Sequence, residues 1–205
     1  MLAQTAARPF DSDRHLFEIK WDGTRCLAFI ERGRVRLQNR HFVEMRGRYP
    51  ELAGLRRLPS GTVLDGEVVV LEDGKPSFRK LQQRDQLLGP IRIEMLSQRL
   101  PATLIVFDLV YFRGESLTQR PLIERRERLK EVIHRLTDPY VIPSDFILKH
   151  GKRYFEEVER QGLEGMMAKR LDSPYLPGKR SAHWLKIKVG RTASVSFKSQ
   201  SFVSS

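Results

Sequence analysis

The chain has 205 residues, of which 40% are hydrophobic and 30% are charged, so it can form one large or two small domains with a core of their own. No apolar run approaches the ~18 residues that a membrane-spanning helix needs, and the N-terminal segment lacks the apolar stretch of a secretory signal. Cys26 is the single cysteine, which excludes an internal disulfide and favours a reducing compartment. We therefore expect a soluble protein of the cytoplasm, with no membrane partner.

The charge indicates the kind of partner. Lysine and arginine number 37 against 25 aspartates and glutamates, a formal net charge of +12. Such an excess attracts polyanions, and nucleic acid is the commonest polyanion in a cell. An anionic membrane surface is the competing interpretation, but no basic amphipathic terminal segment supports it. A merely solubilising charged surface also remains open at this point.

Along the chain, the sequence predicts several strands and two helices. Residues 25–30 and 34–38 predict a hairpin with a glycine-bearing turn, and β-branched or apolar runs predict strands at 63–71 and 103–111. Helical periodicity marks 121–134 and 152–161, with strands at 140–148, 163–170 and 184–189. The charge run 124–131 is typical of a solvated helix face. We expect one strand-rich α+β domain over 1–190, then a weakly ordered, serine-rich tail over 191–205.

Common catalytic signatures are missing from the sequence. It has no glycine-rich phosphate loop, no GxSxG elbow and no metal-site spacing among its histidines. Lysines, arginines and carboxylates are therefore the candidates for chemistry. The densest group is the segment EIKWDGTR, which runs from Glu18 to Arg25 and places the Lys20 amine close to an Asp-Gly bend at a strand end. Taken alone, this segment is more often an ordinary surface turn, because short motifs of this kind occur by chance.

Further acidic and basic residues stand in unusual positions. Asp65 and Glu67 lie two apart within an apolar strand, where a charge is costly unless a cation or ligand pairs with it. Glu164 lies in a glycine-flanked segment that permits close ligand approach. Lys186 and Lys188 alternate along a strand, and two adjacent ammonium groups favour a polyanion such as a triphosphate between them. Structural ion pairs and an exposed strand face are the alternatives.

Taken in order, these segments resemble the nucleotidyltransferase (adenylation) domain of ATP-dependent DNA ligases, in the superfamily that includes RNA ligases and mRNA capping enzymes. The resemblance covers roughly residues 8 to 190, and the motif sequences are most similar to those of bacterial ligases of the end-joining repair type. It rests on the following segments: EIKWDGTR at 18–25, Asn39-Arg40 in place of the usual Ser-Arg, DGE at 65–67, VFD at 106–108, EGMMAK at 164–169 and WLKIK at 184–188.

The resemblance implies a role for each matched residue. Lys20 would attack the α-phosphate of ATP, form a lysyl-AMP intermediate and later pass AMP to the 5′-phosphate of nicked duplex DNA, with Lys186 and Lys188 binding the α-phosphate. Glu164 would position Mg²⁺ or Mn²⁺. Glu18 and the Ile19 backbone would contact the adenine, and Phe107 would stack on it. Glu67 would bind the ribose hydroxyls, and Arg25 and Arg40 would lie near the ribose and phosphates. These assignments predict a DNA repair and recombination enzyme, acting at a bacterial nucleoid.

These residue types suit that chemistry. A free lysine amine titrates near ~10.4, so neighbouring cations that disfavour the ammonium form increase its nucleophilic fraction. The same cations absorb phosphate charge in the transition state. We expect ATP to lie in a groove between antiparallel sheets.

The sequence also departs from the family. Ligases of this type continue into an OB-fold domain, which this chain is expected to lack, so nick sealing would need that domain or end-joining repair proteins in trans. The competing functions are an RNA ligase, a GTP-using capping-type nucleotidyltransferase, and a nick-binding module that does not seal.

Overall fold

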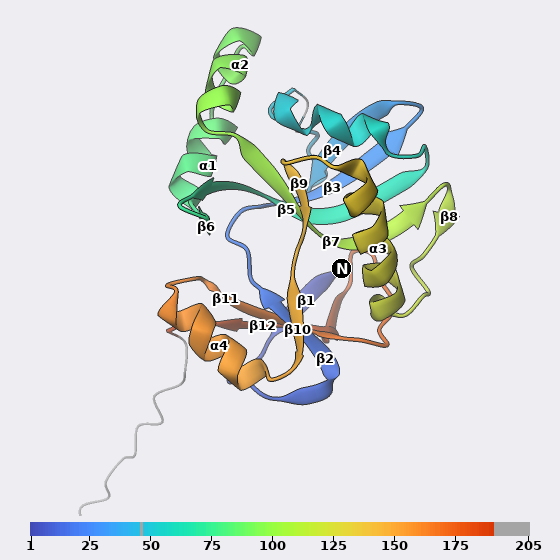
Figure 1. Cartoon of the computed structure of the whole chain (residues 1–205), viewed down its shortest axis with the longest axis vertical. Helices are drawn as coiled ribbons and strands as arrows, with labels where there is room; N and C mark the ends of the chain where they lie inside the picture. Colours follow the sequence, from blue (N-terminus) through green and yellow to red (C-terminus); the bar gives the residue numbers. More distant parts are fainter. Residues whose placement is uncertain (46, 191–205) are drawn as a thin grey trace, which may run out of the picture.

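A computed structural model describes residues 1–45 and 47–190, and it contains two β-sheets (Figure 1). The expected tail at 191–205 lies outside the described residues. One sheet has the strand order β1-β12-β11-β2-β10; its strands are β1 (Leu2–Thr5), β2 (Ser12–Ile19), β10 (Phe146–Lys149), β11 (Gly165–Arg170) and β12 (Arg180–Lys188). We call it the lower sheet, after its place in Figure 1.

The second sheet, the upper sheet, has the order β4-β3-β5-β7-β8, with β6 paired to β5 and β9 paired to β7. Its strands are β3 (Thr24–Glu31), β4 (Arg34–Asn39), β5 (Thr62–Glu72), β6 (Lys75–Pro76), β7 (Ala102–Phe112), β8 (Glu115–Ser116) and β9 (Val141–Pro143). Most strand pairs in both sheets are antiparallel; the parallel ones are β1 with β12 and β7 with β9. The α+β prediction, rich in antiparallel strands, is therefore confirmed.

Local sequence explains the central strands of the upper sheet. β7 is buried along nearly its whole length, as its continuous apolar run predicts. β3 and β4 form the expected hairpin, and the turn between them has positive φ at Arg32 (46°) and Gly33 (71°). Positive φ at both central residues gives a turn whose twist matches that of the strands.

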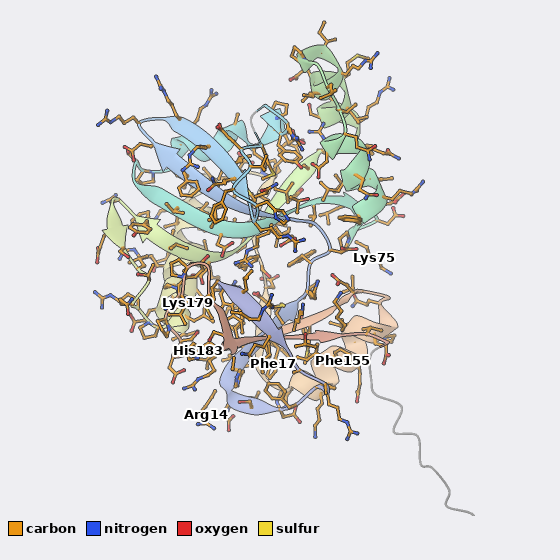
Figure 2. The ribbon with its side chains drawn as sticks, turned by 180° about the vertical axis from the view of Figure 1, so that it is seen from behind. Arg14, Phe17, Lys75, Phe155, Lys179 and His183 are labelled. Atoms are coloured by element: carbon orange, nitrogen blue, oxygen red, sulfur yellow. The ribbon has the colours of Figure 1, made fainter. Side chains whose placement is uncertain are left out.

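The helices cover the sheets from outside. Buried residues of α3 (Leu122–Leu136), including Leu129 and Ile133, join the core of the upper sheet. α4 (Gly151–Arg160) packs on the lower sheet, and its Phe155 belongs to the same buried cluster as Phe17 of β2; both are labelled in Figure 2. A third cluster joins the two sheets, because it combines Phe107 from β7 with Trp184 from β12.

The sequence missed several elements. Neither α1 (Phe78–Asp85), α2 (Pro90–Arg99) nor the 3₁₀ helix η1 (Pro50–Arg57) was predicted, because each is short and buries only one or two side chains. Strand β1 was also missed, since it is mostly exposed. Of β2 only the end beside Lys20 was predicted, since the strand begins with four polar residues.

Two other predictions were wrong. The single strand expected at 140–148 is two strands in different sheets, because β9 ends at Pro143, which has no N–H for a ladder, and β10 then pairs with β2. The solvated face expected at 124–131 includes Arg125 and Arg126, which are only 1% and 4% exposed. Both arginines form ion pairs inside the protein, which residue type alone does not reveal. Among the described residues, no helix is both long and apolar enough to cross a membrane.

Candidate active site

Lys20 follows the last residue of β2, beside the start of β11. Its backbone N–H donates to the carbonyl of Gly165 at 2.9 Å. Gly165 has φ +155°, and a Cβ there would lie 2.1 Å from the carbonyl oxygen of Ile187. Only glycine permits this close approach of β11 to β12. The preceding residue, Glu164, is thereby held between Lys20 and β12.

Three side chains form the centre of the candidate site. The Glu164 carboxylate pairs with Lys20 Nζ through Oε2 and with Lys188 Nζ through Oε1, the latter at 2.6 Å. Burial alone would raise the pKa of Glu164, but the hydrogen bonds from Lys188 and Lys20 outweigh it and the pKa is lowered. The side chains of Lys20, Glu164 and Lys188 are 20%, 23% and 31% exposed, so a ligand can reach all of them.

Two further groups belong to this charge cluster. The pKa of Lys186 is lowered, first by partial burial and then by repulsion from Arg180 and Lys188. The pKa of Asp22 is raised, first by burial and then by the Glu164 carboxylate. The prediction that Lys186 and Lys188 share one strand face agrees with the packing of Ile187, which lies between them in sequence and is buried in the core of the lower sheet.

Glu67 lies on β5, on the opposite side of the site from β11. Burial raises its pKa to about 8, while the positive charges of Arg25 and Lys20 act in the lowering direction. The turn before β3 packs against the same strand: a Cβ on Gly23 would lie 2.2 Å from the carbonyl oxygen of Val68. The Asp-Gly bend therefore brings Lys20 towards Glu67.

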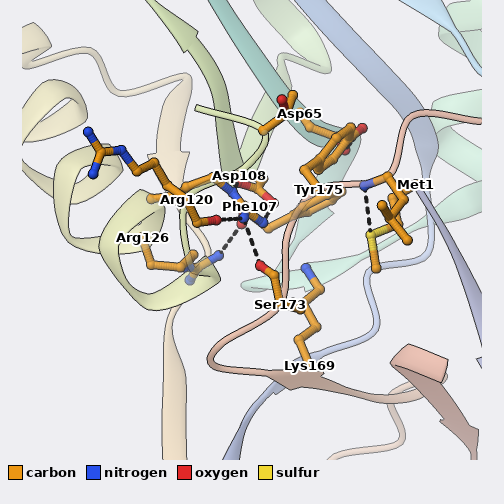
Figure 3. A network of polar contacts seen from close by, with 12 residues as sticks. Met1, Asp65, Phe107, Asp108, Arg120, Arg126, Lys169, Ser173 and Tyr175 are labelled. Carbon is orange, nitrogen blue, oxygen red and sulfur yellow. Dashed lines mark hydrogen bonds and ion pairs between the residues drawn. The ribbon is translucent and has the colours of Figure 1, made fainter. Parts of the chain in front are cut away.

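Phe107 lies where the two sheets meet. Its ring is 5.9 Å from that of Trp184 at an interplanar angle of 83°, and Lys169 Nζ is 4.0 Å from both ring centroids. Figure 3 shows Phe107, Arg126 and Lys169, which come from β7, α3 and β11. The ring that the resemblance assigns to base stacking thus has a lysine ammonium over it in this structure.

Glu18 is 1% exposed and pairs with two cations. Its Oε1 contacts Lys169 Nζ, and its Oε2 accepts from a terminal nitrogen of Arg126 at 3.1 Å. The neighbouring Ile19 aligns with Met166 in the ladder between β2 and β11. Glu18 therefore lies with Phe107 at one end of the candidate site, with its charge fully compensated.

The two remaining predicted residues differ in their surroundings. Arg25 donates from Nε to Asp65 Oδ1 at 2.7 Å and from a terminal nitrogen to Oδ2 at 2.5 Å, and its guanidinium carbon lies 5.0 Å from the Phe107 ring centroid. Asp65 thus has the cation that its buried position requires. Arg40 is exposed in the turn after β4, where it donates to His41 Nε2 at 3.0 Å. The structure brings the other predicted residues together, but it gives Arg40 no contact with them.

Sequence reasoning missed several residues of this network. Asp65 also accepts from the hydroxyl of Tyr175 at 2.7 Å, and Lys169 and Arg126 both bind Glu18. Lys169 was visible as the last residue of the EGMMAK segment. Arg126 and Tyr175 carry no local signal, because the carboxylates that they bind, Glu18 and Asp65, lie 108 and 110 residues away in sequence.

The acidic residues fit a divalent cation that shares its ligands with phosphate. Among the described residues, no group of three or more histidine, cysteine, aspartate or glutamate side chains could enclose a metal. Mg²⁺, however, commonly binds through one or two carboxylates together with substrate phosphates. Glu164, with Asp22 nearby, supplies such a set. Cavities of about 470 and 270 Å³ lie elsewhere, against α3, and are lined by none of the predicted site residues.

This arrangement of two sheets with a lysine and glutamate cluster is that of the nucleotidyltransferase domain of ligases. Residues 1–188 match the family described as ATP dependent DNA ligase domain, and the chain belongs to that family. A structure titled mycobacterial DNA ligase D complexed with ATP and MES is similar, with a TM-score of 0.77 and 31% identity over 92% of this chain and 59% of that one.

Named proteins with similar sequences support the same family assignment. The chain is 33% identical over 190 residues to the SPbeta prophage-derived DNA ligase-like protein LigB of Bacillus subtilis, covering 91% of this chain and 66% of that protein. It is 36% identical over 184 residues to the multifunctional non-homologous end joining DNA repair protein LigD of Mycobacterium tuberculosis, covering 87% of this chain and 22% of that protein. The chain therefore spans less than two thirds of these relatives, and the predicted likeness to end-joining ligases is confirmed.

Proposed function

We propose that this chain is the adenylation unit of an ATP-dependent DNA ligase. The observation that carries the proposal is the shared carboxylate of Glu164 between Lys20 and Lys188. A lysine at a strand end, backed by two further lysines and one carboxylate, suits attack on a phosphate that carries several negative charges. We take residues 1–190 as the unit.

The first step joins Lys20 to AMP. The Nζ lone pair attacks the α-phosphorus of ATP, the bond from that phosphorus to the bridging oxygen breaks, and pyrophosphate leaves while the amine loses its proton. Lys186 and Lys188 neutralise charge that develops on the α-phosphate oxygens. In the second step, a 5′-phosphate oxygen of nicked DNA attacks the same phosphorus and Lys20 leaves as the amine.

Glu164 has a different partner in each state of the site. Without nucleotide it binds the ammonium groups of Lys20 and Lys188. With ATP bound, Glu164 and the phosphates would hold Mg²⁺ or Mn²⁺, which withdraws electron density from the phosphate oxygens when bound. The lysines then lose their carboxylate partner and can face the α-phosphate.

The nucleoside would lie between the sheets. Phe107 would stack on adenine, Glu18 and the Ile19 backbone would contact its edge, and Glu67 would bind the ribose hydroxyls. Arg25 and Arg40 are proposed near the ribose and phosphates, and Arg40 would have to approach them from the exposed turn after β4. Lys169 must move off the Phe107 ring for the base to stack there, because its Nζ is 4.0 Å from the ring centroid.

The net charge of the chain and its membership of the ligase family indicate its partners. The net charge of +12 favours binding of nicked duplex DNA, with an affinity that falls steeply as salt rises. Further partners would be an OB-fold domain and end-joining repair proteins. The protein would act in the cytoplasm, at the nucleoid.

The direct test is the intact mass of the protein after incubation with ATP and Mg²⁺, and separately with GTP. A mass increase of one AMP with ATP is the expected result. Labelling by GTP in preference to ATP would favour a capping-type enzyme. Failure to form any adduct, with DNA binding intact, would favour a nick-binding module.

A further inference from the structure

Arg126 binds three separate segments that surround the candidate base site. One terminal nitrogen donates to Glu18 Oε2 at 3.1 Å and to the carbonyl of Phe107 at 2.7 Å, and the other donates to the carbonyl of Ser144. The hydroxyl of Ser144 in turn accepts from the indole N–H of Trp21 at 3.1 Å. A single side chain from α3 therefore fixes residues on both flanks of Lys20 as well as the strand that carries the Phe107 ring.

The burial and the planar shape of the Arg126 guanidinium fix the directions of these contacts. The residue is 4% exposed, so its donors are directed into the protein and not towards bulk solvent. Its guanidinium is a planar fork with several fixed donor directions, which lysine cannot reproduce. The residue holds Glu18 Oε2 in one direction, while Lys169 binds the other oxygen.

A fixed carboxylate can distinguish purine bases. Adenine carries an amino group on the edge where guanine carries a carbonyl oxygen. An ionised carboxylate accepts hydrogen bonds only, so it binds the amino group and repels the carbonyl. Each Glu18 oxygen has a lone-pair direction left after binding its cation. The discrimination depends on the free direction of Glu18 Oε2 being held towards the base. Arg126 binds that oxygen, and it can hold it after Lys169 has moved off the Phe107 ring.

We propose that Arg126 is a positioning residue for base selectivity: by holding Glu18 and the Phe107 backbone together, it makes the site favour ATP over GTP. This inference rests on the proposed adenylation function, which supplies the nucleotide, and it adds a residue outside the six sequence segments that match the family.

Arg125 offers a matched control. It is the neighbouring residue on α3, is 1% exposed, and forms its own fork with Asp108 through Nε and a terminal nitrogen, each at 2.8 Å. It also donates to the carbonyls of Arg120 and Ser173, but it does not contact Glu18. Arg125→Lys therefore removes a buried fork of the same kind at the same depth.

The experiment compares Arg126→Lys, Arg126→Met, Arg125→Lys and the wild type. Calorimetry without divalent metal gives the Kd of ATP and of GTP, and labelling with Mg²⁺ gives the rate of adduct formation with each. We expect both Arg126 variants to reduce the ATP-to-GTP preference about 10-fold or more, as loss of a buried charged hydrogen bond implies. Arg125→Lys should lower the melting temperature but leave the preference unchanged.

A double variant tests whether Arg126 acts through Glu18. Glu18→Gln should itself reduce the preference, and Arg126→Lys should add little to that loss, because coupled residues are not additive. Should Arg126→Met fail to fold, Arg126→Lys still decides.

An unchanged preference in Arg126→Lys, or equal losses in Arg126→Lys and Arg125→Lys, would overturn the inference. Absence of any wild-type adduct would instead count against the proposed function, and the ratio of Kd values would still test Arg126.

Discussion

Replacement of Asp65 by asparagine should destabilise the protein strongly. Asp65 is fully buried and accepts two hydrogen bonds from Arg25 and one from the Tyr175 hydroxyl. Asp65→Asn keeps the shape but removes the carboxylate charge that is paired with Arg25. Removing one partner of a buried ion pair costs about 3–5 kcal/mol. The unfolding entropy of a chain of this length is about 0.43 kcal/mol/K, so the melting temperature should fall by roughly 7–12 °C.

Differential scanning calorimetry measures this shift, with Asp172→Asn as the control. Asp172 also pairs with an arginine, Arg170, but both side chains are well exposed, at 63% and 39%, so its loss should leave the melting temperature almost unchanged. Equal shifts in Asp65→Asn and Asp172→Asn would refute the reasoning, because burial would then not decide the value of the pair.

The pH dependence gives a second check on Asp65. Burial alone would raise its pKa, but Arg25 outweighs burial and the pKa is lowered. The stabilisation is therefore present above the ordinary aspartate pKa of ~3.9 and is lost as pH falls through the lower, folded-state pKa. The difference in melting temperature between wild type and Asp65→Asn should be full at pH 7 and should shrink below about pH 4.

Three further predictions follow from the site. Phe107→Leu should weaken ATP binding, measured by calorimetry, more than it lowers the melting temperature, because it removes the aromatic face but keeps most of the burial; the opposite pattern would make Phe107 a core residue only. Burial raises the pKa of Glu67 to about 8, so its ionisation costs stability as pH rises from the ordinary value towards 8. Glu67→Gln should therefore raise the melting temperature at pH 9 more than at pH 5 while it weakens ATP binding, and a lower melting temperature at pH 9 would contradict this. Gly165→Ala should slow adduct formation at least 10-fold, as a misplacement near the reacting groups implies, because its Cβ would meet the Ile187 carbonyl at 2.1 Å; normal labelling would show that the approach of β11 to β12 is not needed.

Much of the fold could be predicted because the signals are local. The hairpin of β3 and β4 has its turn glycine at Gly33, and β7 is apolar over almost its full length. Helices α1 and α2 could not be predicted, because they are short and bury few side chains. The division of 140–148 between two sheets depends on partners elsewhere in the chain, although Pro143 marks the point where β9 ends.

The residues of the candidate site also fall into two groups, those that the sequence indicated and those that it did not. Lys20, Glu164 and Lys188 stand in recognisable segments, and the structure joins their side chains. Arg126 looks like one charge in a solvated run, and only the path of α3 past β2 shows that it binds Glu18. Residue type and spacing thus indicated which groups could react, whereas Arg126 and Tyr175, which hold them in place, were visible only from the tertiary structure.

The central claim is that Lys20 carries AMP, and a peptide map of the protein after incubation with ATP and Mg²⁺ tests it most directly. The map should place one AMP on the peptide that contains Lys20. Lys20→Arg should give no adduct while it keeps its fold, because the guanidinium stays protonated. An adduct on another lysine, or one that persists in Lys20→Arg, would contradict the account.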